Sequence, residues 1–209
     1  MAGSRGSTPA IRRAPPDVAD AGRVIAGSAR GVRLAAPAAA TRPLTDRVKQ
    51  TLFAILEPDL DGAAVLDLFA GSGAGAIEAL SRGAASAVLV ERDAGAVRVI
   101  HENLRRAGVE GSARVERREA IAWLAAAGDE RFDLVLVDPP YEDTAALGQA
   151  LELVDRLVAP AGLVVAKHFW RDAPPARVGM LAATRVRRFG ETALTFYRRG
   201  GPEQEAGEA

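Results

Sequence analysis

The residues AVLDLFAGSGAGAIEAL (64–80) carry the strongest fold signal in this chain. The first six, Ala64 to Phe69, form an apolar run interrupted only by Asp67, which is typical of a strand buried on both faces of a parallel sheet. A glycine-rich turn follows, and residues 75–81 are typical of a short helix. A strand, a glycine loop and a helix in this order indicate the first unit of a nucleotide-binding α/β sheet.

The chain after this unit continues the same alternation. The apolar patterns predict strands at residues 87–91, 113–117, 132–138 and 162–168, and helices at 93–107, 120–127 and 144–158. Two further strand patterns, 181–189 and 191–198, flank Gly190 and predict a hairpin that could lie antiparallel at the sheet edge. Strands that alternate with helices favour a doubly wound, mainly parallel α/β sheet.

The chain before residue 61 predicts a small extension. Residues 23–36 are expected to form two short strands with a turn at 28–31, and Thr45 is a good N-cap for a helix whose apolar residues have helical spacing. We therefore divide the chain into a disordered tail (1–21), a hairpin and helix extension (22–60), the α/β domain (61–199) and a second disordered tail (200–209).

Composition excludes several kinds of site. The chain has no cysteine, so disulfides, thiolate metal sites and a cysteine nucleophile are excluded, and its two histidines lie far apart, so we assign no metal. The N-terminus has no apolar segment of the kind a secretory signal needs, and no apolar run is long enough to span a membrane. We expect a cytoplasmic protein.

Charge is distributed unevenly although the net charge is zero. Residues 1–49 hold nine Arg/Lys and three Asp/Glu, residues 50–184 hold thirteen and twenty, and residues 185–199 hold five and one. Basic segments on either side of an acidic middle are typical of a protein that binds a polyanion. The alternative is that these arginines are solvated surface charges.

The glycine loop and a later acid form the first half of a candidate site. Gly71 and Gly73 would let a ligand approach the backbone, and Ala76 holds the third position of a G-x-G-x-x-A pattern. Glu91 ends the second strand, 20 positions after Gly71, where a carboxylate can accept hydrogen bonds from ribose hydroxyls. The pattern alone could serve NAD or S-adenosylmethionine, or the glycines could serve only a tight turn.

The second half is the tetrapeptide Asp138-Pro139-Pro140-Tyr141, which follows the strand FDLVLV. The prolines stiffen the turn and offer no N–H, so the turn presents a carboxylate, free carbonyls and an aromatic ring to a planar ligand with an NH2 group. The alternative is a proline turn in which Asp138 caps the next helix. Strands one and four flank the switch point of such sheets, so Gly71 and Asp138 should face one crevice. A nucleotide there suits methyl transfer to an amine better than hydride transfer.

Four motifs in the same order extend this interpretation. RVIAGSARGVRL, TRPLTDRVKQTLF, LDLFAGSGAGAIEALSRGA and LVLVDPPY together resemble the RsmD family, and the resemblance covers about residues 23–198. It implies a Rossmann-like class I methyltransferase sheet with a short N-terminal β-hairpin and helix extension. It also implies transfer of a methyl group from S-adenosylmethionine to the N2 amine of a guanine in small-subunit ribosomal RNA, naked or within a partly assembled subunit.

The resemblance implies roles for individual residues. Asp138 and the Pro139 carbonyl would accept the two amine N–H bonds, and Tyr141 would stack on the base. Cofactor contacts are expected from Asp67, Phe69, Gly71, Ser72, Gly73, Glu91, Arg92, Glu119 and Ala120. Phosphate contacts are expected from Arg23, Arg30, Arg33, Arg42 and Arg47, with help from Arg185, Arg187 and Arg188.

The chain departs from the family pattern at two places. Gly75 and Ala76 replace a Leu-Gly pair, and Lys167-His168 replaces Glu-His. Lys167 could bring a cation near the substrate phosphates or merely face solvent. Two other functions stay open: a DNA methyltransferase acting on adenine N6 or cytosine N4, and a non-enzymatic ribosome-assembly factor on the same fold. About 40 residues of extension leave little room for the target-recognition region that DNA enzymes carry.

Overall fold

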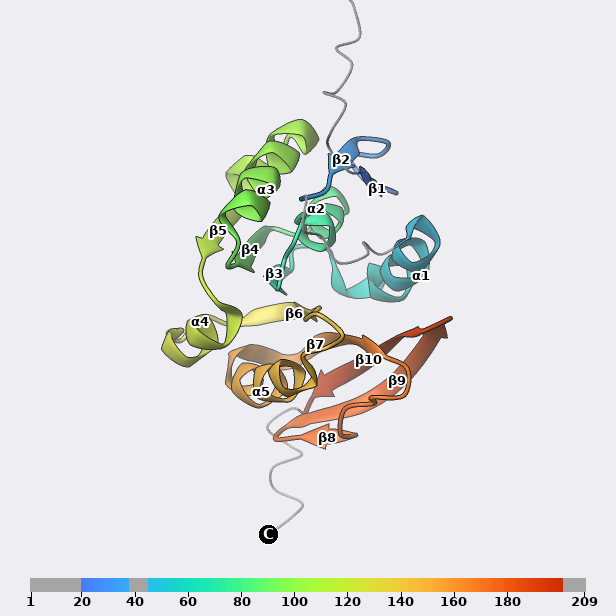
Figure 1. The fold of residues 1–209 in the computed structure, drawn as a ribbon, viewed down its shortest axis with the longest axis vertical. Helices are drawn as coiled ribbons and strands as arrows, with labels where there is room; N and C mark the ends of the chain where they lie inside the picture. The colour runs from blue at the N-terminus through green and yellow to red at the C-terminus, as the bar shows by residue number, and fades with distance from the viewer. Residues whose placement is uncertain (1–19, 38–44, 201–209) are drawn as a thin grey trace, which may run out of the picture.

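The computed structural model describes residues 20–37 and 45–200 (Figure 1). Its centre is an eight-stranded sheet in the order β5-β4-β3-β6-β7-β10-β9-β8. The strands are β3 Ala64–Leu68, β4 Ser86–Glu91, β5 Ala113–Arg117, β6 Phe132–Val137, β7 Val158–Phe169, β8 Arg177–Val178, β9 Leu181–Phe189 and β10 Thr192–Arg199. Strands β3 to β7 pair parallel with one another, and β10 lies antiparallel between β7 and β9. The predicted doubly wound sheet and its antiparallel hairpin at Gly190 are therefore confirmed.

Helices cover both faces of the sheet (Figure 1). Helices α1 Asp46–Leu56, α2 Ala74–Ser81 and α3 Ala94–Ala107 pack into one buried cluster, and helices α4 Ala120–Ala126 and α5 Thr144–Val154 pack into another. Strand β3 contributes Val65 to the first cluster and Leu66 and Leu68 to the second. Burial on both faces explains why this strand is an almost continuous apolar run.

The switch point of the sheet lies between β3 and β6. Strand β3 pairs with β4 on one side and with β6 on the other, and Leu68 is the register partner of Val137. Because both strands are parallel and end at the same level, the glycine loop after β3 and the Asp-Pro-Pro-Tyr turn after β6 emerge side by side. The crevice expected from the sequence is thus formed at this edge.

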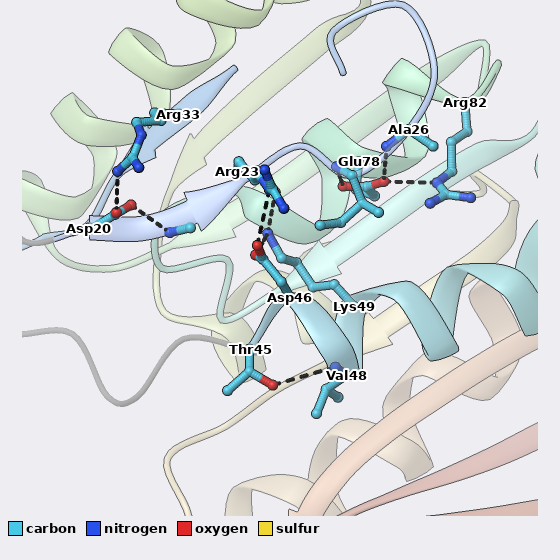
Figure 2. Close-up of polar contacts among 12 residues, drawn as sticks. Asp20, Arg23, Ala26, Arg33, Thr45, Asp46, Val48, Lys49, Glu78 and Arg82 are labelled. Carbon is cyan, nitrogen blue, oxygen red and sulfur yellow. Dashed lines mark hydrogen bonds and ion pairs between the residues drawn. The ribbon is translucent and has the colours of Figure 1, made fainter. Parts of the chain in front are cut away.

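Side chains clamp the N-terminal hairpin to the sheet domain (Figure 2). The hairpin consists of β1 Asp20–Arg23 and β2 Arg33–Ala35, which pair antiparallel. The Glu78 carboxylate, 1% exposed, accepts from Ile25 N at 2.7 Å and Ala26 N at 3.0 Å, and Arg82 Nε donates to it at 2.9 Å. Figure 2 also shows the Lys49 ammonium, which donates to the Arg23 carbonyl oxygen at 2.6 Å. A buried carboxylate with three donors holds the hairpin in one place.

A second contact ties the hairpin to the glycine loop. The Asn103 side chain, fully buried in α3, accepts from Ala35 N at 2.8 Å and donates to Ala35 O and Ser72 O, each at 2.9 Å. The extension and the sheet share one apolar cluster, in which Leu34 lies with residues of β3 and α2. This cluster contains residues from both sides of position 60, so it does not separate the extension from the α/β domain. The division of the chain at residue 60 remains a prediction.

Several predicted boundaries are wrong. Asp20 and Ala21, assigned to a disordered tail, belong to β1, because Asp20 pairs with Ala35 and the Ala21 side chain enters the core. The helix predicted to end at residue 158 ends at Val154, since Val158 pairs with Phe132 as the start of a longer β7. Residues 1–19 and 201–209 of the predicted tails lie outside the described residues. No described helix has both the length and the apolar character to cross a bilayer.

Candidate active site

The glycine loop bends the chain sharply away from β3. Phe69, Gly71 and Gly73 have φ values of 62°, 55° and 75°, in the left-handed region that favours glycine. Gly73 is the N-cap of α2, and its N–H donates to the Ala70 carbonyl at 2.7 Å. Phe69 is not a glycine, so its conformation is strained, and strain of this kind is concentrated at functional sites.

Asp67 lies beneath this loop and is almost fully buried. Its side chain is 4% exposed, and Oδ2 accepts from Ala76 N at 3.0 Å. Burial raises the pKa of Asp67 to about 8, and the negative charges of Asp138 and Glu91 act in the same direction. The hydrogen bond from Ala76 only partly opposes this shift. The carboxyl group can therefore hold a proton near neutral pH.

Glu91 joins the loop to the end of β4. Its Oε2 accepts from Gly71 N and its Oε1 from Asp93 N, each at 2.9 Å. A carboxylate oxygen has two lone pairs, so both oxygens can still accept from a ligand. The spacing of 20 positions between Gly71 and Glu91, seen in the sequence, thus corresponds to a direct contact.

Two adjoining cavities lie around the loop. One, of about 320 Å³, is lined by Phe69, Gly71, Glu91, Arg92, Glu119, Ala120 and Asp138, among others. The other, of about 110 Å³, is lined by Asp67, Phe69, Gly71, Ser72, Lys49, Lys167 and Asp138, among others. Eight of the nine predicted cofactor residues therefore meet here. Gly73 lines neither cavity, and the Glu119 carboxylate also caps α4 by accepting from Ile121 N and Ala122 N.

The Asp-Pro-Pro-Tyr turn places Asp138 on the wall that both cavities share. Asp138 N donates to Leu68 O at 3.4 Å, which holds the turn against the end of β3. The alternative in which Asp138 caps the next helix is wrong, because α5 is capped by Asp143, whose Oδ1 accepts from Ala146 N at 2.9 Å. Pro139, the second residue of the turn, is buried and lines neither of the two cavities.

Lys167 contacts Asp138 directly, so the interpretation that it merely faces solvent is wrong, and a position near the substrate phosphates remains a prediction. Lys167 is 7% exposed, and its Nζ lies 2.6 Å from Oδ1 and 2.9 Å from Oδ2 of Asp138. The same ammonium lies 5.1 Å from the centre of the Tyr141 ring. Lys167 therefore does not face solvent; it is the cation paired with Asp138 in the candidate catalytic turn.

Tyr141 opens onto a third cavity. Its side chain is 36% exposed, and its hydroxyl lies 2.6 Å from Thr192 Oγ1 at the start of β10. A cleft of about 500 Å³ is lined there by Tyr141, Lys167, Arg47 and Arg188, among others. Lys167 lines this cleft as well as the inner cavity beside Asp138, so the two spaces meet at the ion pair.

The structure separates the predicted phosphate-binding arginines into two groups. Arg23 pairs with Asp46 at 3.2 Å, and Arg33 pairs with Asp20 at 2.8 Å. The other predicted arginines in the described residues are exposed and have no carboxylate within 4.0 Å there: Arg30, Arg47, Arg185, Arg187 and Arg188. Arg42 lies outside the described residues.

Two buried polar residues around the site were missed. Asn103 holds the Ser72 carbonyl, and Lys49 lines the inner cavity with its pKa lowered, chiefly by burial. The sequence held one indication of a buried polar residue: Asn103 lies between Ile100 and Leu104, on the apolar face of its helix. Over the described residues, no three or more histidine or carboxylate side chains are grouped as a metal site. His168 is buried and contacts Thr195 Oγ1 at 2.9 Å.

Known proteins resemble the chain over most of its length. The model of the family described as "Conserved hypothetical protein 95" matches residues 22–198. "Putative rRNA methyltransferase YlbH" of Bacillus subtilis is 39% identical over 184 residues, which are 86% of this chain and 100% of that protein. "Ribosomal RNA small subunit methyltransferase D" of Escherichia coli is 35% identical over 180 residues, 85% of this chain and 89% of that protein.

A solved structure shares the fold. "Putative methyltransferase yhhF from Escherichia coli" superposes with a TM-score of 0.76 and 34% identity, covering 85% of this chain and 97% of that one. The eight-stranded sheet with helices on both faces is therefore a class I methyltransferase fold. Because the family model spans most of the chain and the relatives agree over nearly their full lengths, this protein belongs to the conserved hypothetical protein 95 family, the RsmD family.

Proposed function

We propose that this protein transfers a methyl group from S-adenosylmethionine to the exocyclic N2 amine of a guanine in small-subunit ribosomal RNA. The observation that carries the proposal is the position of Asp138, on the wall between the glycine-loop cavities and next to the cleft that Tyr141 and Lys167 line. Two relatives are named as rRNA methyltransferases, and one of these names specifies the small subunit. Such a substrate would place the enzyme in the cytoplasm.

The residues around the glycine loop fit this cofactor. Its ribose hydroxyls need acceptors, which Glu91 supplies, and its cationic methionine end needs a buried acid, which Asp67 supplies. Apolar groups of Val90, Ala96 and Ala120 line the side of the cavity suited to adenine. When bound, S-adenosylmethionine supplies an electrophilic methyl group on a sulfonium. Eight of the nine cofactor residues named from the sequence line these cavities, which supports their proposed role.

Asp138 orients the substrate amine. The lone pair of a guanine amine is delocalised into the ring, and acceptors for its two N–H groups let the nitrogen pyramidalise and aim its lone pair at the methyl group. We assign these acceptors to Asp138 and the Pro139 carbonyl, with Tyr141 stacking on the base. Placing two groups in line in a water-poor site supplies most of the rate enhancement. Asp138 then takes up the amine proton only late in the reaction.

The target guanine has to leave its stack to reach Asp138. A paired base cannot bring its amine to a site behind Tyr141, so the substrate nucleotide is unpaired or flipped out. The exposed arginines of the extension and of β9 would contact the flanking phosphates.

A labelled-methyl assay tests the proposed function. The purified protein is incubated with S-adenosylmethionine carrying a labelled methyl group and with naked small-subunit ribosomal RNA, partly assembled small subunits, or duplex DNA. We expect label in N2-methylguanosine from one of the two RNA substrates, found by nucleoside mass spectrometry. Label in adenine or cytosine of DNA would identify a DNA methyltransferase instead. Tight RNA binding with no transfer to any substrate would identify an assembly factor.

A further inference from the structure

The turn between β9 and β10 holds one arginine in a fixed position. The guanidinium carbon of Arg188 lies 3.6 Å from the centre of the Trp170 ring, and its Nε donates to Gly190 O at 2.9 Å. Trp170 is itself anchored, since its backbone N–H donates to Glu191 O at 3.0 Å and its ring lies 6.3 Å from that of Phe169. A guanidinium stacked on an indole ring is a strong form of cation–π contact. Arg188 is thus ordered before any ligand arrives.

These contacts leave the terminal nitrogens of Arg188 available. Trp170 covers one face of the guanidinium and Gly190 occupies the Nε–H, while the two Nη atoms have no hydrogen-bond partner among residues 20–37 and 45–200. The Nη groups of arginine form a planar fork that matches two oxygens of a phosphate. The group left free is therefore the one that recognises a phosphate.

Arg188 belongs to the cleft that leads to the candidate catalytic turn. It lines the same cavity of about 500 Å³ as Tyr141 and Lys167, and Arg47 of α1 lines it too. The contact between Tyr141 and Thr192 joins the Asp-Pro-Pro-Tyr turn to the start of β10, the neighbour of the strand that carries Arg188. A nucleotide stacked on Tyr141 would thus have its backbone next to Arg188.

The charges of the cleft favour an anion. Its charged lining residues are Arg47, Lys167, Arg188 and Glu191, and Lys167 already contacts Asp138. Arg47 and Arg188 have no carboxylate within ion-pair distance in the described part of the chain, and Glu191 is the acid that faces them. We propose that Arg188 binds an RNA phosphate beside the target guanine, and that Trp170 is the residue that positions it. The inference rests on the proposed function, whose substrate contact it specifies.

The first test compares RNA affinities of single variants. The RNA is a small-subunit ribosomal RNA transcript that the wild-type protein binds, and affinity is measured over a range of salt concentrations. Arg188→Ala should weaken binding roughly 5- to 10-fold and reduce the salt slope by about 0.7 to 0.9, the value for one phosphate contact. Arg188→Lys should recover only part of the affinity, since an ammonium cannot form the fork.

Arg177 provides a matched control. It is an exposed arginine without an ion-pair partner among the described residues, but its register partner on β9 is Ala182, six positions before Arg188. Six residues of strand separate the two sites by roughly 20 Å. Arg177→Ala should therefore leave affinity and salt slope unchanged. Glu191→Gln should tighten binding about two- to threefold by removing the acid of the cleft.

Trp170 can be tested as a positioning residue and as a reporter. The guanidinium carbon of Arg171 also lies 4.8 Å from the centre of the Trp170 ring. In an Arg171→Ala background, Trp170→Leu should therefore weaken RNA binding when Arg188 is present but not in Arg188→Ala, because its effect then passes through Arg188. The chain has two tryptophans, and the other one, Trp123, is 6% exposed and belongs to α4. In a Trp123→Phe background, RNA should change the emission of Trp170, and Arg188→Ala should abolish most of that change.

Specific outcomes overturn the inference. If Arg188→Ala binds RNA with the affinity and salt slope of Arg177→Ala while the wild type methylates RNA, this inference fails and the proposed function stands. If Arg188→Ala weakens binding to partly assembled subunits but not to naked RNA, the partner of Arg188 is a protein and the phosphate assignment is wrong. If the wild type neither binds nor methylates RNA, the proposed function fails as well.

Discussion

Lys167 Nζ lies within 2.9 Å of both carboxylate oxygens of Asp138, so one buried ammonium group contacts the whole acceptor that we assign to the substrate amine. Each carboxylate oxygen has two lone pairs, so an amine can still bind on the side away from the lysine. The ion pair fixes the plane of the carboxylate. It also leaves the outward lone pairs as the ones a guanine could use.

Replacing Lys167 tests the importance of this orientation. We expect Lys167→Met to lower kcat roughly 10- to 100-fold, since a misplacement of about 1 Å has an effect of that size, while cofactor affinity changes little. Lys167→Arg keeps the charge and should retain more activity. Steady-state kinetics with RNA and calorimetric titration with cofactor separate the two effects. A Lys167→Met enzyme with wild-type kcat would show that the ion pair does not orient Asp138.

Replacing Asp138 tests the acceptor itself. Asp138→Ala should abolish methylation with cofactor affinity largely intact, and Asp138→Asn, which keeps one acceptor oxygen, should retain a measurable rate. Because Asp138→Ala leaves Lys167 buried without its partner, the double variant Asp138→Ala/Lys167→Met serves as the control for stability. Undiminished turnover in either Ala variant would remove Asp138 from the mechanism.

The raised pKa of Asp67 predicts a pH dependence of stability. Its pKa in the folded protein is about 8 against 3.8 for an ordinary aspartate, so between these values the folded state holds a proton that the unfolded state has lost. The stabilisation of the folded state by protonated Asp67 is therefore fully present below pH 3.8 and is lost as the pH rises through about 8. In urea unfolding, the free energy of unfolding should fall more steeply with pH for the wild type than for Asp67→Asn between about pH 5 and about pH 8. Parallel curves would contradict the shift.

The same group predicts a pH dependence of cofactor binding. If the ionised Asp67 contacts the cationic end of the cofactor, affinity should rise with pH up to about 8, because binding has to displace the proton. The ligand's own amine titrates in the same way with both proteins, but Asp67→Asn should lack this rise in affinity. The difference between the two pH profiles of cofactor affinity therefore reports on Asp67 alone. Equal pH profiles for wild type and variant would place the cofactor's cation elsewhere.

Two glycines of the hairpin test how tightly it is clamped. Both have left-handed φ values, 82° at Gly27 and 86° at Gly31, but a Cβ at Gly27 would lie 1.7 Å from Ser81 O whereas nothing lies within 4 Å at Gly31. Gly31→Ala should cost about 1–2 kcal/mol of unfolding free energy through backbone strain alone. Gly27→Ala should cost clearly more, because the atom in the way is backbone. Equal losses in chemical denaturation would show that the hairpin moves freely against α2.

Arginines of the extension should contribute unequally to RNA binding. Arg47 has no acid partner among the described residues, so Arg47→Ala should lower the salt slope by about 0.7 to 0.9. Arg33 already pairs with Asp20, and a phosphate has to compete with that carboxylate, so Arg33→Ala should have a smaller effect. Equal slopes for the two variants would mean that the Asp20 pair is broken on binding.

Local patterns predicted the central strands of the sheet well, because strands buried on both faces are recognisable as apolar runs between glycine-rich turns. Boundaries that depend on distant partners were missed. Val158 begins β7 because Phe132 lies beside it, and Asp20 begins β1 because of Ala35. Neither partner can be identified from the local sequence, since register is a property of two strands.

The site divides in the same way. Gly71 and Glu91 could be paired from their spacing, because one strand, one helix and the next strand separate them in a fixed unit. The contact between Lys167 and Asp138 could not be predicted from spacing. It depends on the register of β6 and β7, in which Val137 lies beside Ala166, so that the residues that follow them, Asp138 and Lys167, are neighbours. Residues on neighbouring strands meet through pairing that no linear pattern records.

The clamp on the hairpin limits how this protein can change its RNA target. Glu78, Ser81 and Asn103 bond to the backbone of residues 25–35, whatever the side chains there, so the path of the hairpin is set by helices α2 and α3. Deleting the hairpin would leave the buried Glu78 carboxylate and the buried Asn103 amide without their backbone partners. New specificity for RNA can therefore arise by substitution at exposed positions such as Arg30 and Arg33. Replacing the whole hairpin would also require matching substitutions in α2 and α3.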